Sequence, residues 1–156
     1  MRFARALLLA LLFLSPAWSY AQREKLPPED LEIVRERYPE AKRTSTSLRY
    51  VVLRAGDGPQ PASGDSVSVL YTGKLLDGTV FDSSTDPTKP FTFQTDRGEV
   101  IQGFDEGIGA MRVGEKRILI IPFELGYGTR GQPPRIPRRA TLIFELELIE
   151  VKPRTP

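Results

Sequence analysis

Histidine and cysteine are both absent from the 156-residue chain. Without them the protein has no Ser-His-Asp triad, no thiol nucleophile and no zinc site built from cysteine and histidine. It also forms no disulfide, so the folded part must be stabilised by its core alone. A chain of this length is sufficient for one domain with a substantial core, and we expect a single domain with short extensions.

The first 21 residues have the composition of an export signal. Arg2 and Arg5 precede an apolar run over residues 6–14, and a small-residue site follows at residues 19–21. We expect cleavage after Ala21 and export to the periplasm, with secretion as the alternative. An uncleaved membrane anchor is a further alternative, but nine apolar residues are far fewer than the ~20 that a spanning helix needs. No stable membrane insertion is therefore expected.

The basic charge of the chain lies partly in that leader. The whole chain has 22 basic and 20 acidic residues, and removing residues 1–21 leaves 20 of each. Nucleic-acid-binding proteins normally carry a basic surplus, which the mature protein lacks. The composition therefore does not favour nucleic acid as a partner.

Residues 22–45 form a polar N-terminal arm in this interpretation. The stretch "LPPEDLEIVRERYPE" predicts one short helix, with Pro27 and Pro28 at its start, acidic residues in its first turn and Pro39 at its end. We expect the globular domain over residues 46–152 and a short tail over residues 153–156.

Short strand patterns recur through the expected domain. The segments "SLRYVVLR", "SVSVLY", "FTFQTD" and "KRILIIPF" favour strands, and residues 142–148 alternate apolar side chains with Glu145 and Glu147. Only "GFDEGIGAM" spaces its apolar residues at helical intervals, and its glycines make it a helix that packing must stabilise. These patterns predict an α+β fold, an antiparallel sheet with one helix across its face.

A hairpin is predicted at Asp77-Gly78, which lies between two apolar strands. If its loop has two residues, Tyr71 lies opposite Ser84 and Gly73 lies opposite Asp82. Tyr71 and Asp82 then share one face of the ribbon and can hydrogen-bond, whereas Phe81 points to the other face.

Other motifs favour no familiar chemistry. Residues 126–131 match G-x-G-x-x-G, but the following "QPPRIPRR" contains prolines that prevent the helix a dinucleotide site requires. The carboxylates lack the spacing of a calcium loop. A glycosidase-like pair of acids stays open at this point. We expect no metal and no cofactor.

Several motifs together resemble the FKBP-type peptidyl-prolyl cis-trans isomerases. They are "VLYTGKLLDGTVFDSS", "KPFTF", "EVIQGFDEGIGAMRVGEKR", "LGYGTRG" and "IPRRATLIFELELIEV", and they occur in the order and spacing of that family, here suggesting its exported bacterial type. The resemblance implies a half-barrel sheet wrapped around one short helix. The substrate proline would lie in the apolar hollow between sheet and helix.

The resemblance also implies which residues form the pocket. The catalytic set is Tyr71, Asp82, Ile101 and Tyr127. The substrate-binding set is Phe81, Phe91, Val100, Phe104, Ile136 and Phe144. In this reading the Ile101 backbone N–H and the Tyr127 hydroxyl bind substrate carbonyls, while Asp82, oriented by Tyr71, stabilises the rotated amide. Because the family uses both Phe81 and Asp82, the second hairpin strand must bend or bulge there.

The implied activity explains why no nucleophile is needed. Rotating an X-Pro bond breaks no covalent bond and has a torsional barrier of ~18–20 kcal/mol. The expected partners are proline-containing unfolded or nascent exported polypeptides, and we expect a monomer. Phe104 stands where the family usually has tryptophan, which implies reduced affinity for macrolide inhibitors.

Two alternatives to catalysis remain at this stage. One is a peptide-binding chaperone module that uses the same pocket without turnover. The other is an assembly factor in which the arm is the active part. A further hypothesis concerns Arg130, Arg135, Arg138 and Arg139, which by resemblance overhang the pocket and would attract acidic peptides.

Overall fold

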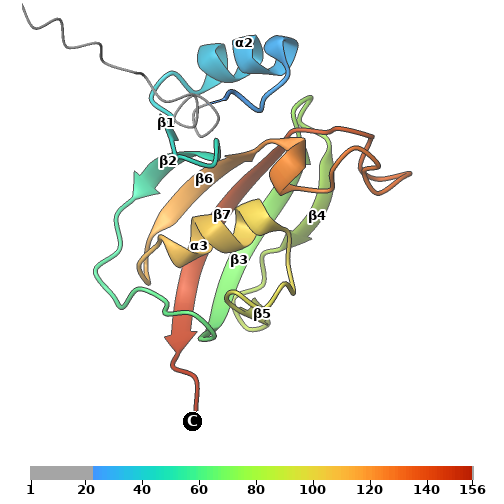
Figure 1. Ribbon diagram of the computed structural model, residues 1–156. Helices are drawn as coiled ribbons and strands as arrows, with labels where there is room; N and C mark the ends of the chain where they lie inside the picture. Colours follow the sequence, from blue (N-terminus) through green and yellow to red (C-terminus); the bar gives the residue numbers. More distant parts are fainter. Residues whose placement is uncertain (1–22, 156) are drawn as a thin grey trace, which may run out of the picture.

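The computed structural model describes residues 23–155 (Figure 1). The predicted export signal and its cleavage site at Ala21 lie outside these residues. Within residues 23–155, no helix has the length and apolar character that crossing a membrane requires.

One antiparallel sheet forms the body of the protein. Its strands run in the order β1-β2-β6-β7-β3-β4, and β5 pairs with β3 on the same edge as β4. The strands are β1 (Lys42–Arg43), β2 (Arg49–Arg54), β3 (Ser66–Leu75), β4 (Val80–Ser84), β5 (Phe91–Gln94), β6 (Lys116–Ile121) and β7 (Leu142–Lys152). The helices are α2 (Pro28–Arg37), α3 (Gln102–Gly109) and a 3-10 turn at Phe123–Leu125. The predicted α+β fold is confirmed.

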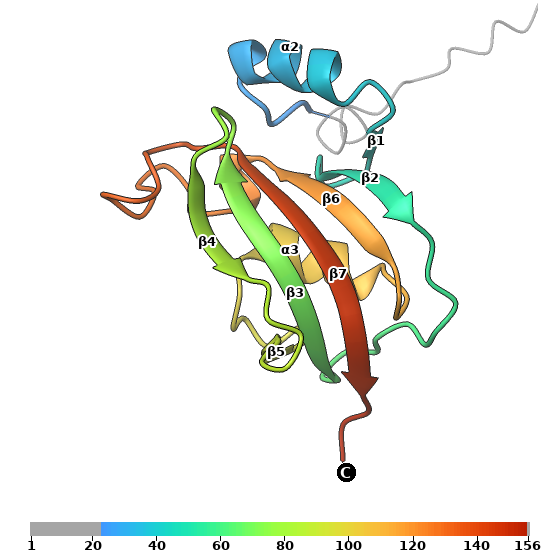
Figure 2. The same ribbon diagram turned by 180° about the vertical axis from the view of Figure 1, so that it is seen from behind.

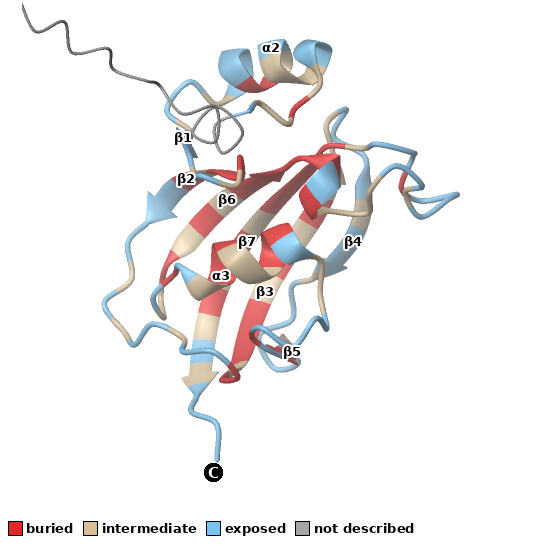
Figure 3. Ribbon diagram, in the orientation of Figure 1, coloured by how far each residue is buried: buried red, intermediate tan, exposed pale blue. Residues whose placement is uncertain are grey.

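The main core lies between α3 and one face of the sheet (Figures 1 and 3). Alternate residues of β7 from Leu142 to Leu148 point into it, and Phe104 and Ile108 enter from α3. Fully burying one such side chain stabilises the fold by roughly 1.5–3 kcal/mol. This packing holds α3 in place despite its glycines, as the sequence predicted.

The hairpin differs from the prediction at its tip. Its loop has three residues rather than two, because Leu75 N–H donates to Thr79 O at 2.8 Å and Gly78 takes a φ of 93°. A bulge then follows, with Gly73 opposite Asp82 but Lys74 opposite Val80, so Phe81 is the extra residue. The bulge restores the register, and Tyr71 lies opposite Ser84 as predicted.

The N-terminal arm packs against the sheet. Val34 of α2 is buried in a second cluster with Leu26, Ile120 and Ile143. Ile120 alternates along β6 with residues of the main core, so this cluster lies on the opposite face of the sheet from α3. Figure 2 shows α2 at the end of the sheet where the β3–β4 hairpin turns.

Polar contacts fix the arm to several parts of the domain. Thr141 Oγ1 donates to Asp30 Oδ2 at 2.6 Å, and Arg37 Nη1 donates to Leu76 O at 2.5 Å. Arg49, only 9% exposed, donates through both terminal nitrogens to the Glu24 carboxylate. The short strand β1 adds the arm to the edge of the sheet through its pairing with β2. The arm is therefore an integral part of the fold.

Neutralising Glu24 should remove an acid-sensitive part of the stability. Burial by itself would raise the pKa of Glu24, but Arg49 and the Leu26 and Lys25 N–H groups lower it by more. The net result is a pKa of about 2 instead of 4.5. A lowered folded-state pKa stabilises the fold above pH 4.5, and this stabilisation is lost as the pH falls towards 2. Acidification should therefore lower the free energy of unfolding of the parent protein by about 2–3 kcal/mol through this group. Glu24→Gln should not show this acid-dependent decrease.

Urea unfolding at pH 7, 5 and 3 measures this difference. Glu36→Gln, which removes an exposed carboxylate of α2, is the matched control and should keep the acid dependence of the parent protein. Identical pH profiles for Glu24→Gln and the parent would show that the ion pair contributes nothing to stability.

Candidate active site

A cavity of about 370 Å³ opens between the β3–β4 hairpin, the start of α3 and the turn after β6. All the residues that the sequence analysis proposed line it, with the exception of Ile136. The aromatic members of the lining are Tyr71, Phe81, Phe91, Phe104, Tyr127 and Phe144, and the others are Asp82, Glu99, Val100 and Ile101. The site is thus a mainly aromatic hollow with two carboxylates at its wall.

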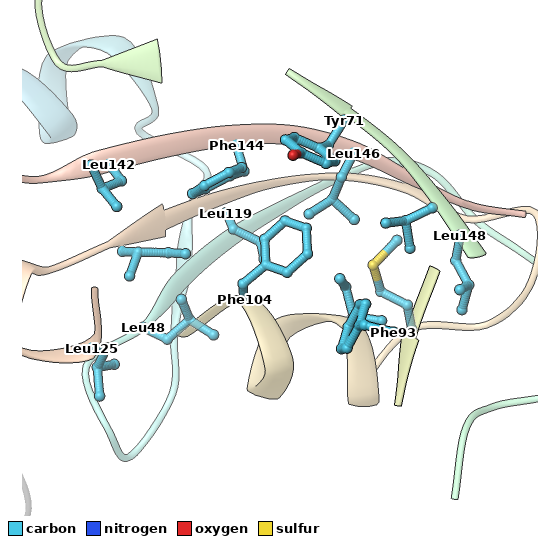
Figure 4. Close-up of a cluster of buried hydrophobic side chains, with 14 of the residues drawn as sticks. Leu48, Tyr71, Phe93, Phe104, Leu119, Leu125, Leu142, Phe144, Leu146 and Leu148 are labelled. Atoms are coloured by element: carbon cyan, nitrogen blue, oxygen red, sulfur yellow. The ribbon is translucent and has the colours of Figure 1, made fainter. Parts of the chain in front are cut away.

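Three rings from three elements form the base of the hollow (Figure 4). The ring of Phe104, 3% exposed, lies 5.5 Å from that of Tyr71 and 4.9 Å from that of Phe144, measured between centroids. Both contacts are edge-on, the arrangement that the charge distribution of aromatic rings favours. α3, β3 and β7 therefore hold the base rigidly together.

Asp82 is oriented by Tyr71 across the hairpin. The Tyr71 hydroxyl donates to Asp82 Oδ2 at 2.7 Å, and the Ser83 N–H donates to Asp82 Oδ1 at 2.9 Å. Burial, then the hydrogen bond and the charge of Asp82, raise the pKa of Tyr71. The hydroxyl consequently stays protonated and keeps donating, which fixes the carboxylate at the cavity wall.

The bulge at Phe81 brings its ring into the cavity beside Asp82. A regular strand would place these neighbours on opposite faces, and the extra residue removes that alternation. The ring packs edge-on against Phe144, with centroids 5.5 Å apart. Both rings lie over Gly73, where a Cβ atom would come within 2.8 Å of each. The bend that the resemblance required is therefore present, and a glycine makes room for it.

Two hydrogen-bond donors at the cavity wall are unpaired within the described part of the chain. Among residues 23–155, no group accepts from the Ile101 N–H, and none bonds with the Tyr127 hydroxyl. Ile101 precedes the first residue of α3, where backbone N–H groups are not used by the helix itself. Burial, followed by the charge of Asp82, raises the pKa of Tyr127, so its hydroxyl is also protonated. Both groups are available to a carbonyl-bearing ligand.

Two residues differ from the sequence prediction. Ile136, expected to bind substrate, is 2% exposed and belongs to the main core, so it supports the loop from below. Glu99 lines the cavity and was not predicted, although it directly precedes Val100 and Ile101, which were. The position of Glu99 directly before these two predicted residues could have indicated that it lines the cavity. No group of acidic side chains within residues 23–155 is arranged to hold a metal ion.

Comparison with known proteins assigns the chain to one family. Residues 58–149 match the FKBP-type peptidyl-prolyl cis-trans isomerases, which is more than half of the chain. The chain belongs to this family. The arm, residues 23–45, precedes the matched region.

Relatives of this FKBP-type chain occur in several kingdoms. Human "Peptidyl-prolyl cis-trans isomerase FKBP2" is 55% identical over 92 residues, covering 59% of this chain and 65% of that protein. "FK506-binding protein 2B" of Rhizopus delemar is 45% identical over 155 residues, covering 98% of this chain and 66% of that protein. The chain thus spans less than two thirds of the length of either curated relative.

Solved structures of bacterial proteins have the same fold. A peptidyl-prolyl cis-trans isomerase from Pseudomonas syringae superposes with a TM-score of 0.71 at 32% identity, covering 80% of this chain and 92% of that one. FkpA from Escherichia coli also gives a TM-score of 0.71, at 41% identity, covering 80% of this chain and 58% of that one.

The loop beside Tyr127 should be sensitive to a methyl group at Gly131. Gly131 has a φ of 65°, and a Cβ atom there would lie 2.2 Å from Pro137 O. Gly131→Ala must therefore shift the loop backbone, and we expect at least a fivefold loss of affinity for a proline peptide, measured by calorimetry. Left-handed backbone also costs a non-glycine residue roughly 1–2 kcal/mol.

Gly128→Ala is the matched control. Gly128 has a φ of 66° in the same loop, yet nothing lies within 4 Å of its Cβ position. It should lose similar stability while binding the peptide as the parent does. Equal affinities for the two variants would show that the clash at Gly131 does not reach the cavity.

Proposed function

We propose that this chain is an exported peptidyl-prolyl cis-trans isomerase that assists the folding of exported proteins. The observation that carries the proposal is the aromatic cavity with the oriented carboxylate of Asp82 and two donors, Ile101 N–H and Tyr127 hydroxyl, that have no partner within residues 23–155. Family membership supports the reaction class. The catalytic roles of these residues are part of the proposal.

The chemistry follows from the barrier. The planar amide is stabilised by resonance, and its carbonyl carries more negative charge than that of the twisted form. An apolar cavity solvates the more polar planar form less well than water does and so favours the twisted one. The Ile101 N–H and the Tyr127 hydroxyl bind carbonyl groups of the substrate, while Asp82 stabilises the rotated amide. No covalent intermediate is involved.

The export proposal is supported by the leader-like residues 1–21, and the bacterial type by likeness to two bacterial structures. Clients are proline-containing unfolded or nascent polypeptides, and the protein acts as a monomer. Phe104 at the base implies that macrolide inhibitors bind with reduced affinity.

A protease-coupled assay with a proline tetrapeptide tests the activity. The protein should accelerate the slow cis-to-trans phase, which takes tens to hundreds of seconds uncatalysed, in proportion to its concentration. Binding of the same peptide without acceleration would instead support the non-catalytic chaperone module. Deleting residues 22–45 and repeating both measurements tests the alternative in which the arm is the active part.

The export proposal predicts a mature chain that begins at Gln22. Intact-mass measurement of the protein from the soluble exported fraction of the producing cell should give the mass of residues 22–156. Recovery of the full chain from washed membranes would show an anchor instead.

A further inference from the structure

A strongly basic loop borders the cavity. Residues 125–144 include no Asp or Glu but contain four arginines, all exposed: Arg130, Arg135, Arg138 and Arg139. No ion pair within residues 23–155 includes any of them. The preceding carboxylate, Glu124, lies 3.7 Å from Lys25 of the arm. Within the described residues, no carboxylate at ion-pair distance therefore compensates the charge of this loop.

The fold holds this loop in a defined shape. Gln132 and Ile136 exchange backbone hydrogen bonds of 2.8 and 3.0 Å, and the buried Ile136 anchors the loop to the core. The guanidinium of Arg139 stacks over the Phe123 ring at 4.8 Å. Arg139 also has a φ of 55°, a conformation that non-glycine residues rarely adopt. The loop backbone is thereby held in place, with the four arginine side chains exposed on its surface.

The loop that carries Arg135 is hydrogen-bonded to the segment around Tyr127, since the Gly131 N–H donates to Tyr127 O at 3.1 Å and the Arg139 N–H donates to Gly128 O at 3.2 Å. Burial and the charge of Asp82 raise the pKa of Tyr127, whereas the charge of Arg135 lowers it. The exposed Arg135 side chain therefore belongs to a loop that borders the cavity at Tyr127, and its charge favours a negative group there. A ligand group bound beside Tyr127 experiences the same positive charge.

Two exposed carboxylates also line the cavity, Asp82 from β4 and Glu99 from the segment between β5 and α3. The Glu99 carboxylate is held towards β5, because the Gln94 N–H donates to its Oε2 at 3.2 Å. The charge of Asp82 acts on Tyr127, on the side of the arginine loop, whereas Glu99 lines the cavity from the segment that precedes α3. Charges of opposite sign therefore reach the cavity from two different segments, the arginine loop and the segment between β5 and α3.

We propose that the cavity selects prolyl segments by the position of charge on either side of the proline. An acidic residue is favoured on the flank that lies towards Arg135, and a basic residue is favoured on the flank that lies towards Glu99. The inference rests on the proposed prolyl-peptide site. Carboxylates elsewhere on the protein do not cancel the preference, since charges beyond ~8–10 Å are largely screened at moderate salt.

Titration of labelled peptides followed by NMR tests this preference. Six peptides carry Asp, Lys or Ala either directly before or directly after the proline. At low salt we expect Asp to bind about threefold to fivefold more tightly than Lys on one flank, and the reverse order on the other. Both differences should shrink at high salt. Equal affinities at low salt, or the same preference on both flanks, would overturn the proposal.

Single variants test which charged side chain causes each preference. Arg135→Gln should abolish the acidic preference only, and Glu99→Gln the basic preference only. Arg35→Gln removes the same charge from exposed α2 and should leave both unchanged. An acidic preference that survives in Arg135→Gln contradicts the inference.

The same spectra separate this inference from the isomerase proposal. Exchange peaks between cis and trans forms of the Ala peptides report catalysis, and shift changes report binding. Charge preference without exchange would contradict the isomerase proposal alone, whereas exchange without charge preference would contradict the charge proposal alone.

Discussion

Phe104→Ala is expected to lower the free energy of unfolding by about 3–5 kcal/mol and to remove most of the isomerase activity. The ring is 3% exposed and contacts Tyr71 and Phe144, so its removal leaves a void that these neighbours cannot fill. It also removes the base against which a proline ring would pack. Chemical denaturation and the coupled assay, run well below the unfolding transition, measure the two losses separately.

Phe123→Ala is a matched control for this effect. Phe123 is also buried, but it stacks with Arg139 and does not line the cavity. Its loss should destabilise the fold while the folded protein keeps its activity. A folded Phe104→Ala protein with the activity of the parent would show that the Phe104 ring is ordinary core and not the base of the site.

Asp82→Ala is expected to reduce kcat/KM roughly tenfold while changing peptide affinity less than twofold. Its carboxylate is exposed and held by Tyr71, so the fold depends on it little, and its effect is greatest on the rotated amide. Kinetics in the coupled assay, with the peptide Kd from calorimetry, separate turnover from binding.

Tyr71→Phe tests whether the tyrosine acts through Asp82. It keeps the ring contacts of Tyr71 but removes the hydrogen bond to Asp82, so a smaller loss of turnover is expected. Because the two groups act as a unit, the double variant should be no worse than Asp82→Ala. Asp77→Ala, a carboxylate at the tip of the same hairpin, is the control and should keep full efficiency. An unchanged kcat/KM in Asp82→Ala would show that Asp82 has no part in catalysis and is only a residue of the hairpin.

The fold class could be read from the sequence because it depends on local patterns. Alternation along residues 142–148 correctly indicated which side of β7 faces the core. The spacing of Phe104 and Ile108 correctly indicated the buried side of α3. These patterns indicate directly which side chains are buried, and they do not depend on the details of packing.

The hairpin shows where local patterns stop being sufficient. The sequence predicted the pairing of Tyr71 with Ser84 from a two-residue loop, whereas the structure reaches it through a three-residue loop and a compensating bulge. The bulge depends on a tertiary contact, since it lets the rings of Phe81 and Phe144 pack together over Gly73. No alternation within the strand encodes a contact made with β7.

The arm and the wall of the cavity were likewise decided by tertiary structure. A polar segment gave no sign that Val34 would be buried against Ile120 and Ile143, because that apolar surface exists only once the sheet has formed. The same holds for Glu99, which reaches the cavity, and for Ile136, which anchors the loop beneath it. The sequence patterns indicated the elements and their buried faces, and the resemblance to the FKBP family implied nearly all of the residues around the cavity. Which side chain faces the cavity and which supports it depended on contacts between segments far apart in the chain.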